Sequence, residues 1–407
     1  MASLSGIFPC DVVVEILARL PARSVIQFRR VSKSWRSLLS GRYFATIWLN
    51  RSGSSLLVLP LEWDNRDECS LVFENVTIGR QHLMLPVSNQ WLSLSLVGSS
   101  GDGSLICLAG LSYVRQGTSK LSIILWKPFR DEVRFLSQHG YIYCNHRSLC
   151  SESQLLGYSS GCCDQYQVHG FGYVPNAQDY KIVRITYSRG GAAAAPIRPW
   201  HIEVYSLGQN KWTSHGRPSF TWMIRGNSRA YVNGAAHWLA APTEEALYDS
   251  IVAFGLEEES FRQVFPLPRT GYLSQFSLHA RGKATLSVLH GSLALIAFTL
   301  WNREECGIWV MGKYGVDTSW TKQHHIVLPM GATCRAALGL TWHDKIVLRM
   351  VDERLVYFDL QGAQITEVGV EIDANESSFD VIDLGRGNPT LRNQGDPGFP
   401  LPMLDLE

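Results

Sequence analysis

The sequence has almost no net charge, no long apolar run and no paired cysteine motif, and each absence excludes a class of protein. Its 37 Lys and Arg balance 36 Asp and Glu, so the formal charge of +1 gives no overall argument for nucleic acid or anionic membrane. No apolar run approaches the roughly 18–20 residues that span a bilayer. The nine cysteines are odd in number and lack repeated C-x-x-C pairs, which favours a reducing compartment. No signal peptide is visible, so we expect a protein of the cytoplasm, the nucleus or both, not a secreted one.

Hydrophobic residues make up 45% of the 407 residues, which is ample for a large core. The charge is unevenly spread. Residues 1–50 contain seven Arg or Lys against Asp11 and Glu15, a local charge of +5. The rest of the chain is mildly acidic. A small basic segment ahead of an acidic body indicates that this segment has a partner of its own, of acidic character.

Residues 9–48 have the spacing of three short helices. The first has one apolar face at i, i+3, i+4 and i+7, formed by Val13, Ile16, Leu17 and Leu20. Pro21 ends that helix and begins the second. Ser32 is the expected N-cap of the third. A module of about 40 residues without a metal-ligand pattern needs a partner to be stable, or else it is a helical cap packed on the rest of the chain.

From residue 55 onward, short apolar runs are separated by Gly, Pro, Asn and Asp, which predicts an all-β body. One unit recurs, in which an apolar strand ends in a large residue and a second large residue follows a polar loop. The five instances are IILWKPFRDEV, IEVYSLGQNKW, IVAFGLEEESF, GIWVMGKYGVDTSW and LVYFDLQGAQI. Their first anchor residues are Trp126, Tyr205, Phe254, Val310 and Phe358.

A second motif alternates with the first: a turn residue that leads into an apolar strand. Its instances are DGSLICLA, NGAAHWLA, HGSLALIA and HDKIVLRM. Alternating hairpin signals at about 50-residue intervals predict a β-propeller. Residues 55–100 and the segment near 379–384 are available for one or two further units, so we expect about six to seven blades. A β-sandwich is the structural alternative.

The sequence offers little chemistry. Residues 157–161 match G-x-S-x-G, but no amphipathic helix follows them, as a nucleophile elbow requires. Histidines and cysteines gather between His139 and His169 without the spacing of a structural zinc site. His237 lies in an apolar strand and is expected to be a core histidine bonded to backbone, while 324–325 lie at a loop or strand edge. We therefore predict no catalytic residue, no metal and no cofactor.

The run FPCDVVVEILARLPARSVIQFRRVSKSWRSLLSGRYFATIWL resembles the F-box of plant F-box proteins along its full length. It departs from the family at Phe8, where Leu is usual. The resemblance implies three short helices in residues 1–50 that bind the Skp-type adaptor of a Skp–Cullin–F-box ubiquitin ligase, and through it the cullin and RING subunits. The adaptor-binding residues that we expect are Phe8, Pro9, Val12, Val13, Ile16, Leu17, Leu20, Pro21, Val25, Phe28, Val31, Ser32, Trp35 and Leu38.

Residues from about 101 to 360 resemble the F-box-associated, kelch-like domain that follows the F-box in many plant proteins. The sequence has only one Gly-Gly doublet, at 190–191, so it is similar to the associated type rather than to strict kelch repeats. The implied organisation is a linker with the first strands at 51–100, the propeller at 101–385 and a flexible tail at 386–407.

The resemblance implies a non-catalytic subunit whose propeller binds a protein to be ubiquitinated. We expect Trp200, Trp222 and Arg225, of residue types enriched at binding hot spots and placed in predicted loops, to contact that substrate. Two alternatives remain open. One is an S-locus type of F-box protein that recognises pistil ribonucleases. The other is a propeller that binds a small ligand without ligase assembly.

Overall fold

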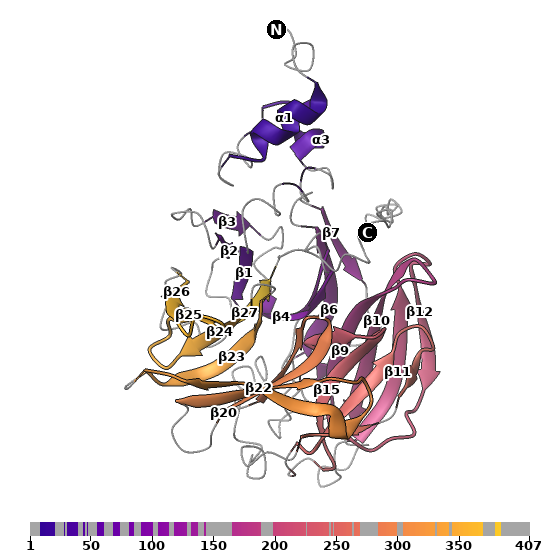
Figure 1. Cartoon of the computed structure of the whole chain (residues 1–407). Helices are drawn as coiled ribbons and strands as arrows, with labels where there is room; N and C mark the ends of the chain where they lie inside the picture. The colour runs from indigo at the N-terminus through magenta and orange to yellow at the C-terminus, as the bar shows by residue number, and fades with distance from the viewer. Residues whose placement is uncertain are drawn as a thin grey trace.

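The computed structural model shows a small helical module followed by a ring of antiparallel β-sheets (Figure 1). In the strands within 55–84 and 379–383, the description covers the backbone alone. The residues described are 9–20, 28, 31–39, 44, 47, 55–60, 68–73, 81–84, 91–100, 105–113, 118–127, 132–136, 142–143, 165–188, 198–224, 226–243, 246, 248–262, 264–268, 284–298, 304–329, 332–341, 344–368 and 379–383.

Five sheets are blades, each formed by one continuous stretch of chain. Blade 1 contains β4 (Trp91–Ser99), β5 (Ile106–Tyr113), β6 (Thr118–Lys127), β7 (Glu132–Leu136) and β8 (Ile142–Tyr143). Blade 2 contains β9 (Gln165–Val174), β10 (Asp179–Ser188), β11 (Arg198–Ser206) and β12 (Lys211–Gly216). Blade 3 contains β13 (Met223–Ile224), β14 (Ala230–Val232), β15 (Ala235–Ala241), β16 (Ser250–Gly255), β17 (Ser260–Phe261) and β18 (Phe265–Pro266). Blade 4 contains β19 (Ala284–Leu289), β20 (Ser292–Phe298), β21 (Glu305–Met311) and β22 (Trp320–Val327), with a 3₁₀ turn at Asp317–Ser319. Blade 5 contains β23 (Cys334–Leu340), β24 (Lys345–Met350), β25 (Leu355–Asp359) and β26 (Ile365–Glu367).

The remaining described sheet joins the two ends of the β domain, and we call it the closing sheet. It places β27 (Phe379–Asp383) beside β1 (Ser55–Pro60), followed by β2 (Glu68–Phe73) and β3 (Gln81–Met84). Neighbouring sheets approach one another through the inner strands β4, β9, β14, β19, β23 and β27, and β27 in turn approaches β4. The ring is therefore closed by pairing between residues more than 300 positions apart in the sequence.

The prediction of an all-β propeller behind a few helices is confirmed, but the expected number of six to seven blades is wrong. The described chain contains five blades, one for each anchor unit found in the sequence. The sequence offered residues 55–100 and the segment near 379–384 as one or two further units. Instead, β1, β2, β3 and β27 form the closing sheet together, and β4 is the first strand of blade 1. Single-sequence patterns identify hairpins from local signals, and they carry no signal for pairing between distant chain ends.

The recurring sequence unit is the hairpin of the third and fourth strands in each blade. In four blades the two anchors are direct cross-strand partners: Trp126 with Val133, Tyr205 with Trp212, Phe254 with Phe261, and Phe358 with Ile365. In blade 4, Trp320 lies opposite Met311, one residue beyond the anchor Val310. Large side chains that face each other across strands stabilise a hairpin by about 0.2–1 kcal/mol each, which explains the repeated spacing.

The second sequence motif marks the turn into the second strand of a blade. Asn233 and Gly234 have φ of 51° and 74°, and His290 and Gly291 have 48° and 79°. Two consecutive residues with positive φ are the signature of the tight turns that match the twist of a hairpin. Asp344 at φ 56° takes this role in blade 5.

The core lies between the blades. Separate apolar clusters fill the interfaces of blades 1 and 2, 2 and 3, 3 and 4, and 4 and 5. Strands buried on both faces are mostly apolar, as in β16, whose six residues are all buried and of which only Ser250 is polar. Gly170 permits a close approach of blades 2 and 3, because a Cβ there would lie 2.6 Å from Ala236 Cβ and 2.8 Å from the Trp238 ring.

The helical module contains α1 (Cys10–Leu17) and α3 (Lys33–Leu39), which confirms the first and third predicted helices. The predicted middle helix lies outside the described residues except for Phe28, which is helical. The backbone N–H of Trp35 donates to Ser32 Oγ at 3.2 Å, which confirms Ser32 as the N-cap. An apolar cluster runs from the helices into blade 1, so the module packs on the propeller.

Each blade has two distinct ends. The turns between strands one and two and between strands three and four lie at one end, which we call the turn face. The connections between strands two and three lie at the opposite end, the loop face. In the closing sheet, β27 is the inner strand and β1 the second, so the chain enters the ring through the start of β1 at the turn face.

Candidate docking surfaces

The helical module exposes an apolar stripe. Val12 and Ile16 are one turn apart on α1 and are 40% and 52% exposed, and Val31 ahead of α3 is 63% exposed. Large apolar side chains on a helix normally face its core. The exposure of Val12, Ile16 and Val31 in the isolated chain therefore marks a candidate docking surface, and we call these three residues the helical stripe.

The opposite side of α1 is part of the module's own core. Val14, Leu17 and Ala18 are buried together with Leu39 and Phe44. The Phe28 and Trp35 rings meet edge to face with centroids 5.3 Å apart. Trp35 is therefore a packing residue of the module as well as a predicted adaptor contact.

The predicted adaptor-binding residues fall into four groups. Pro9, Val12, Ile16, Val31 and Ser32 are exposed. Five are half-buried and pack on the module's core or contribute to it: Val13, Leu20, Phe28, Trp35 and Leu38. Leu17 is 4% exposed and lies inside the core. Phe8, Pro21 and Val25 lie outside the described residues.

The predicted substrate-contacting residues do not form one described cluster. Trp200 lies within strand β11 rather than in the expected loop, and 49% of its surface is exposed. Trp222 lies just before β13, is half-buried, and its carbonyl accepts a hydrogen bond from Tyr187 Oη at 2.9 Å. Arg225 lies outside the described residues.

The first strand of blade 3 is interrupted, and residues 226–229 between β13 and β14 contact the inner strands of blades 1, 2 and 5. We call them the axial segment. Asn227 Nδ2 donates to Ser95 Oγ at 2.8 Å and to Leu96 O at 3.1 Å in blade 1. Arg229 Nη1 donates to Leu338 O in blade 5 at 3.3 Å. Blades 1 and 5 are each next but one to blade 3, so these bonds join inner strands that are not neighbours in the ring.

Asn227 also sets the state of a buried histidine in blade 2. The backbone N–H of His169 donates to Asn227 Oδ1 at 3.0 Å, and His169 Nδ1 lies 3.1 Å from the same oxygen. An amide oxygen can only accept hydrogen bonds. Nδ1 of His169 must therefore carry a proton and donate it to Asn227 Oδ1. Burial, with the nearby Arg184 charge, lowers the pKa of His169 to about 3, so the ring is neutral at physiological pH.

His237 is a core histidine bonded to backbone, as predicted. Its Nδ1 lies 3.2 Å from Ala230 O and its Nε2 lies 2.9 Å from Tyr314 Oη in blade 4. Burial lowers the pKa of His237 to about 4, despite the hydrogen bond to Ala230. His237 therefore links two blades in its neutral form.

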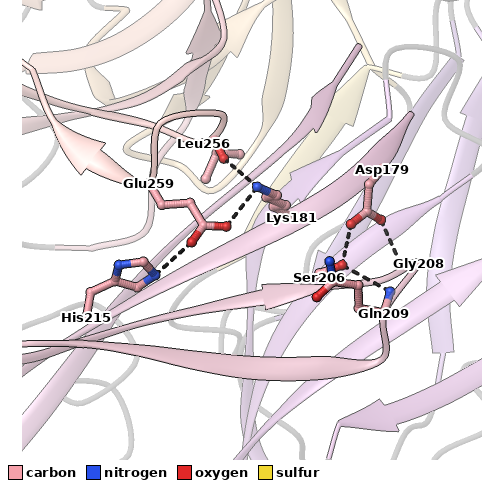
Figure 2. A network of polar contacts seen from close by, with 8 residues as sticks. All are labelled: Asp179, Lys181, Ser206, Gly208, Gln209, His215, Leu256 and Glu259. Atoms are coloured by element: carbon pink, nitrogen blue, oxygen red, sulfur yellow. Dashed lines mark hydrogen bonds and ion pairs between the residues drawn. The ribbon is translucent and has the colours of Figure 1, made fainter. Parts of the chain in front are cut away.

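Ion pairs and hydrogen bonds join blades 2 and 3 near the turn face (Figure 2). Lys181 Nζ lies 2.7 Å from Glu259 Oε1 and donates to Leu256 O at 3.1 Å. His215 Nε2 lies 2.8 Å from the other oxygen of Glu259. This network fixes the position of the two blades relative to each other.

A second group in Figure 2 joins two turns of blade 2. Asp179 accepts hydrogen bonds from Ser206 Oγ at 2.5 Å and from Gly208 N at 2.7 Å. Ser206 Oγ in turn accepts one from Gln209 N at 3.0 Å. The Ser206 hydroxyl thus holds the two turns together, and the Asp179–Ser206 pair has a structural role.

The described residues provide no centre for metal chemistry. No group of three or more His, Cys, Asp or Glu that would suit a metal ion occurs among them. Most of the histidine and cysteine positions between His139 and His169, and the G-x-S-x-G match, lie outside the described residues. Cys107, Cys306 and Cys334 are buried free thiols, and burial raises the pKa of Cys107 and brings that of Cys306 to about 12.

His324 and His325 lie on the outermost strand of blade 4, as predicted for a strand edge. No helix in the described part of the chain is long and apolar enough to cross a membrane.

Two residues with important contacts were missed by the sequence reasoning. Asn227 had only a neighbouring glycine as a local signal, and Arg217, whose guanidinium covers Trp200, had none.

The fold defines the class, a short helical module followed by one β-propeller, and comparisons with known proteins agree. The family model described as F-box domain matches residues 7–46, and that described as F-box associated beta propeller domain matches residues 102–381. The chain belongs to the plant F-box proteins with an F-box-associated β-propeller domain.

Three curated relatives come from Arabidopsis thaliana. F-box protein At3g07870 is 27% identical over 79% of this chain and 74% of its own length. F-box/kelch-repeat protein At3g23880 is 25% identical over 77% and 78%, and F-box protein CPR1 is 22% identical over 92% and 87%. F-box domains typically bind Skp-type adaptors, and F-box proteins of the adaptor type are generally non-catalytic. The combination of F-box and propeller indicates a substrate receptor of Skp–Cullin–F-box ligases.

Proposed function

We propose that this chain is a non-catalytic substrate receptor that binds a Skp-type adaptor through the helical stripe and a substrate protein through the propeller. The observation that carries the proposal is the exposure of Val12, Ile16 and Val31 on a module whose other described apolar residues, apart from Pro9, are buried or half-buried. The cullin and RING subunits join through the adaptor, and the cytoplasm or nucleus stays the predicted compartment.

The charge of the module supports the same surface. Arg19, Lys33 and Arg36 are exposed on the elements that carry the stripe. Basic side chains around an apolar contact accelerate association with an acidic partner, and salt screens that effect. We therefore expect the two arginines and the lysine to accelerate association, and the helical stripe to determine the affinity.

The structure offers a sharper test of docking than a substitution of Trp35, since loss of that ring also removes packing with Phe28. Ile16→Ala/Val31→Ala removes side chains that are more than half exposed, so the module keeps its core. Burial of the exposed half of each of these two side chains against the adaptor contributes about 1 kcal/mol to binding. We expect the double variant to bind a purified plant Skp-type adaptor about 30-fold more weakly than wild type in calorimetric titration.

The matched control is Val327→Ala/Val351→Ala, since these propeller residues are 57% and 55% exposed. It should bind the adaptor with wild-type affinity. Equal affinity of the Ile16/Val31 variant and wild type, or failure of folded wild type to bind any plant adaptor, would refute the docking assignment and leave the helices as a cap on blade 1.

The axial segment bears on the small-ligand alternative. A ligand in the centre of the propeller needs space between the inner strands, and Asn227 and Arg229 bridge from blade 3 to the inner strands β4 and β23. This placement favours recognition on the outer surfaces of the propeller over a central ligand pocket.

A further inference from the structure

Blade 2 presents a basic aromatic patch, which we define as Arg198, Trp200, His201 and Arg217. Trp200 is the only Trp, Tyr or Phe residue of the described β11 and β12 strands with about half of its surface exposed. The patch lies at the start of β11, on the loop face, away from the face where the chain enters the ring.

A β-bulge projects Trp200 from the sheet. Thr186 pairs with His201 and Tyr187 pairs with Pro199, which leaves Trp200 without a cross-strand partner in β10. The neighbours on both sides hold the strand, since Pro199 and Ile202 are buried. A bulge places one extra residue in a strand and redirects its side chain, and bulges are enriched beside functional sites.

A second bulge lies on the adjacent strand pair. Ile202 pairs with Gly216 and Glu203 pairs with Ser214, so His215 is the extra residue in β12. His215 is redirected toward Glu259 of blade 3. The two bulges thus give two side chains different roles: His215 contacts blade 3, and Trp200 faces solvent.

The exposed indole is held in place before any partner arrives. The Arg217 guanidinium lies over the Trp200 ring at 4.6 Å from its centroid. Such a stack orders both side chains and reduces the entropy lost on binding. Trp and Arg are also the residues most enriched at binding hot spots.

The charge of the patch selects the partner. Residues 198–222 contain the basic residues Arg198, Lys211 and Arg217 and a single carboxylate, Glu203. Arg184 is the ion-pair partner of Glu203 at 2.5 Å, so that carboxylate is engaged within the blade. Among the ion pairs between described residues, none includes Arg198 or Arg217.

We propose that the basic aromatic patch binds an acidic segment of the substrate protein, in which carboxylates meet Arg198 and Arg217 and an apolar side chain packs on Trp200. This inference rests on the proposed receptor function and names the substrate chemistry for it. Separation of the patch from the entry point of the chain leaves the helical stripe accessible while a substrate segment is bound.

The test uses the full chain and an array of twelve-residue peptides, each with one Leu or Phe, in which the number of Asp and Glu residues increases stepwise. Wild-type signal should rise with acidic content and fall with added salt. Trp200→Ala and Arg217→Ala should each weaken binding of the best acidic peptide about 30-fold, as expected for hot-spot residues. Trp200→Phe should retain part of the affinity, and Val327→Ala should retain all of it.

A signal independent of acidic content, or unchanged affinity in Trp200→Ala, overturns the proposal. A single-stranded oligonucleotide of equal charge that binds as tightly, with the same loss in the variants, also overturns it, because the patch is then a general anion surface. Adaptor affinity is measured on the same samples. If wild type binds the adaptor but none of the acidic peptides, the patch proposal alone is refuted. If wild type binds the acidic peptides but no adaptor, the receptor function is refuted.

Discussion

Lowering the pH from 7.5 to 5.0 is expected to reduce the free energy of unfolding by about 4 kcal/mol, through two buried histidines. His169 and His237 have pKa values of about 3 and about 4 in the folded protein, below the ordinary value near 6.5. Between these values the unfolded chain binds more protons than the folded one. Stability is therefore complete above about pH 6.5 and is lost as the pH falls, by about 2 kcal/mol for each histidine at pH 5.0.

Urea denaturation at several pH values measures this effect. His169→Gln and His237→Gln will each lower stability at pH 7.5, but each should also remove about half of the change between pH 7.5 and 5.0. The carboxyls of Glu258, Asp352 and Asp359 have lowered pKa values, so their contribution is lost mainly below pH 5 and does not obscure the histidines. A pH dependence that is the same in both variants and wild type would contradict this assignment.

Asn227→Ala is expected to lower the free energy of unfolding by about 3 kcal/mol, although Asn227 itself is only partly buried. Its amide accepts two hydrogen bonds from His169 and donates two to β4, so it joins blades 1, 2 and 3. Removal leaves two donors of His169, a residue 1% exposed, without a partner, and each costs about 1–3 kcal/mol.

Two further variants distinguish the hydrogen bonds from the mere presence of the side chain. Asn227→Asp keeps the shape, but places a carboxylate oxygen against Leu96 O, where the amide donated, and should be at least as destabilising. Arg229→Ala, two residues on, removes the contacts of an exposed side chain, including the bond to Leu338 O, and should cost less than about 1 kcal/mol. Similar denaturation midpoints for Asn227→Ala and Arg229→Ala would show that the axial contacts do not join the blades.

The acid sensitivity and the axial contacts concern the same part of the molecule. His169 holds its proton on Nδ1 because Asn227 Oδ1 accepts it, and it stays neutral because it is buried and lies near the Arg184 charge. Protonation of His169 therefore requires opening around the axial segment. The proposed binding of a substrate segment at the basic aromatic patch requires an intact blade 2. Conditions that open the blades around Asn227 should therefore weaken that binding as well as stability.

Sequence patterns located the hairpins accurately because a hairpin is a local structure. Tyr205 faces Trp212 and Phe254 faces Phe261 across the strand pairs, so their spacing along the chain reflects a direct contact. The N-cap at Ser32 and the turn at Asn233 depend on one or two residues each. The buried, backbone-bonded state of His237 was also predictable from its apolar strand.

The candidate site was less accessible to sequence reasoning. Helical periodicity places Ile16 and Leu17 on one apolar face, but packing on Leu39 and Phe44 buries Leu17 and leaves Ile16 exposed. Trp200 was identified as a contact residue by its type, whereas its exposure arises from a register shift between β10 and β11. Neither a register shift nor the choice of buried face leaves a mark in residue spacing.

By itself, the sequence determined the order of modules, five third-to-fourth-strand hairpins and the turns that lead into second strands, because contacts between neighbours in the chain set all of these. Only the tertiary structure decided the number of blades, through pairing of β1 with β27, and the bonds that join Asn227 to β4. It also decided which apolar residues remain exposed for partners. These features join segments far apart in the chain, and their free energy exists only once the ring is closed.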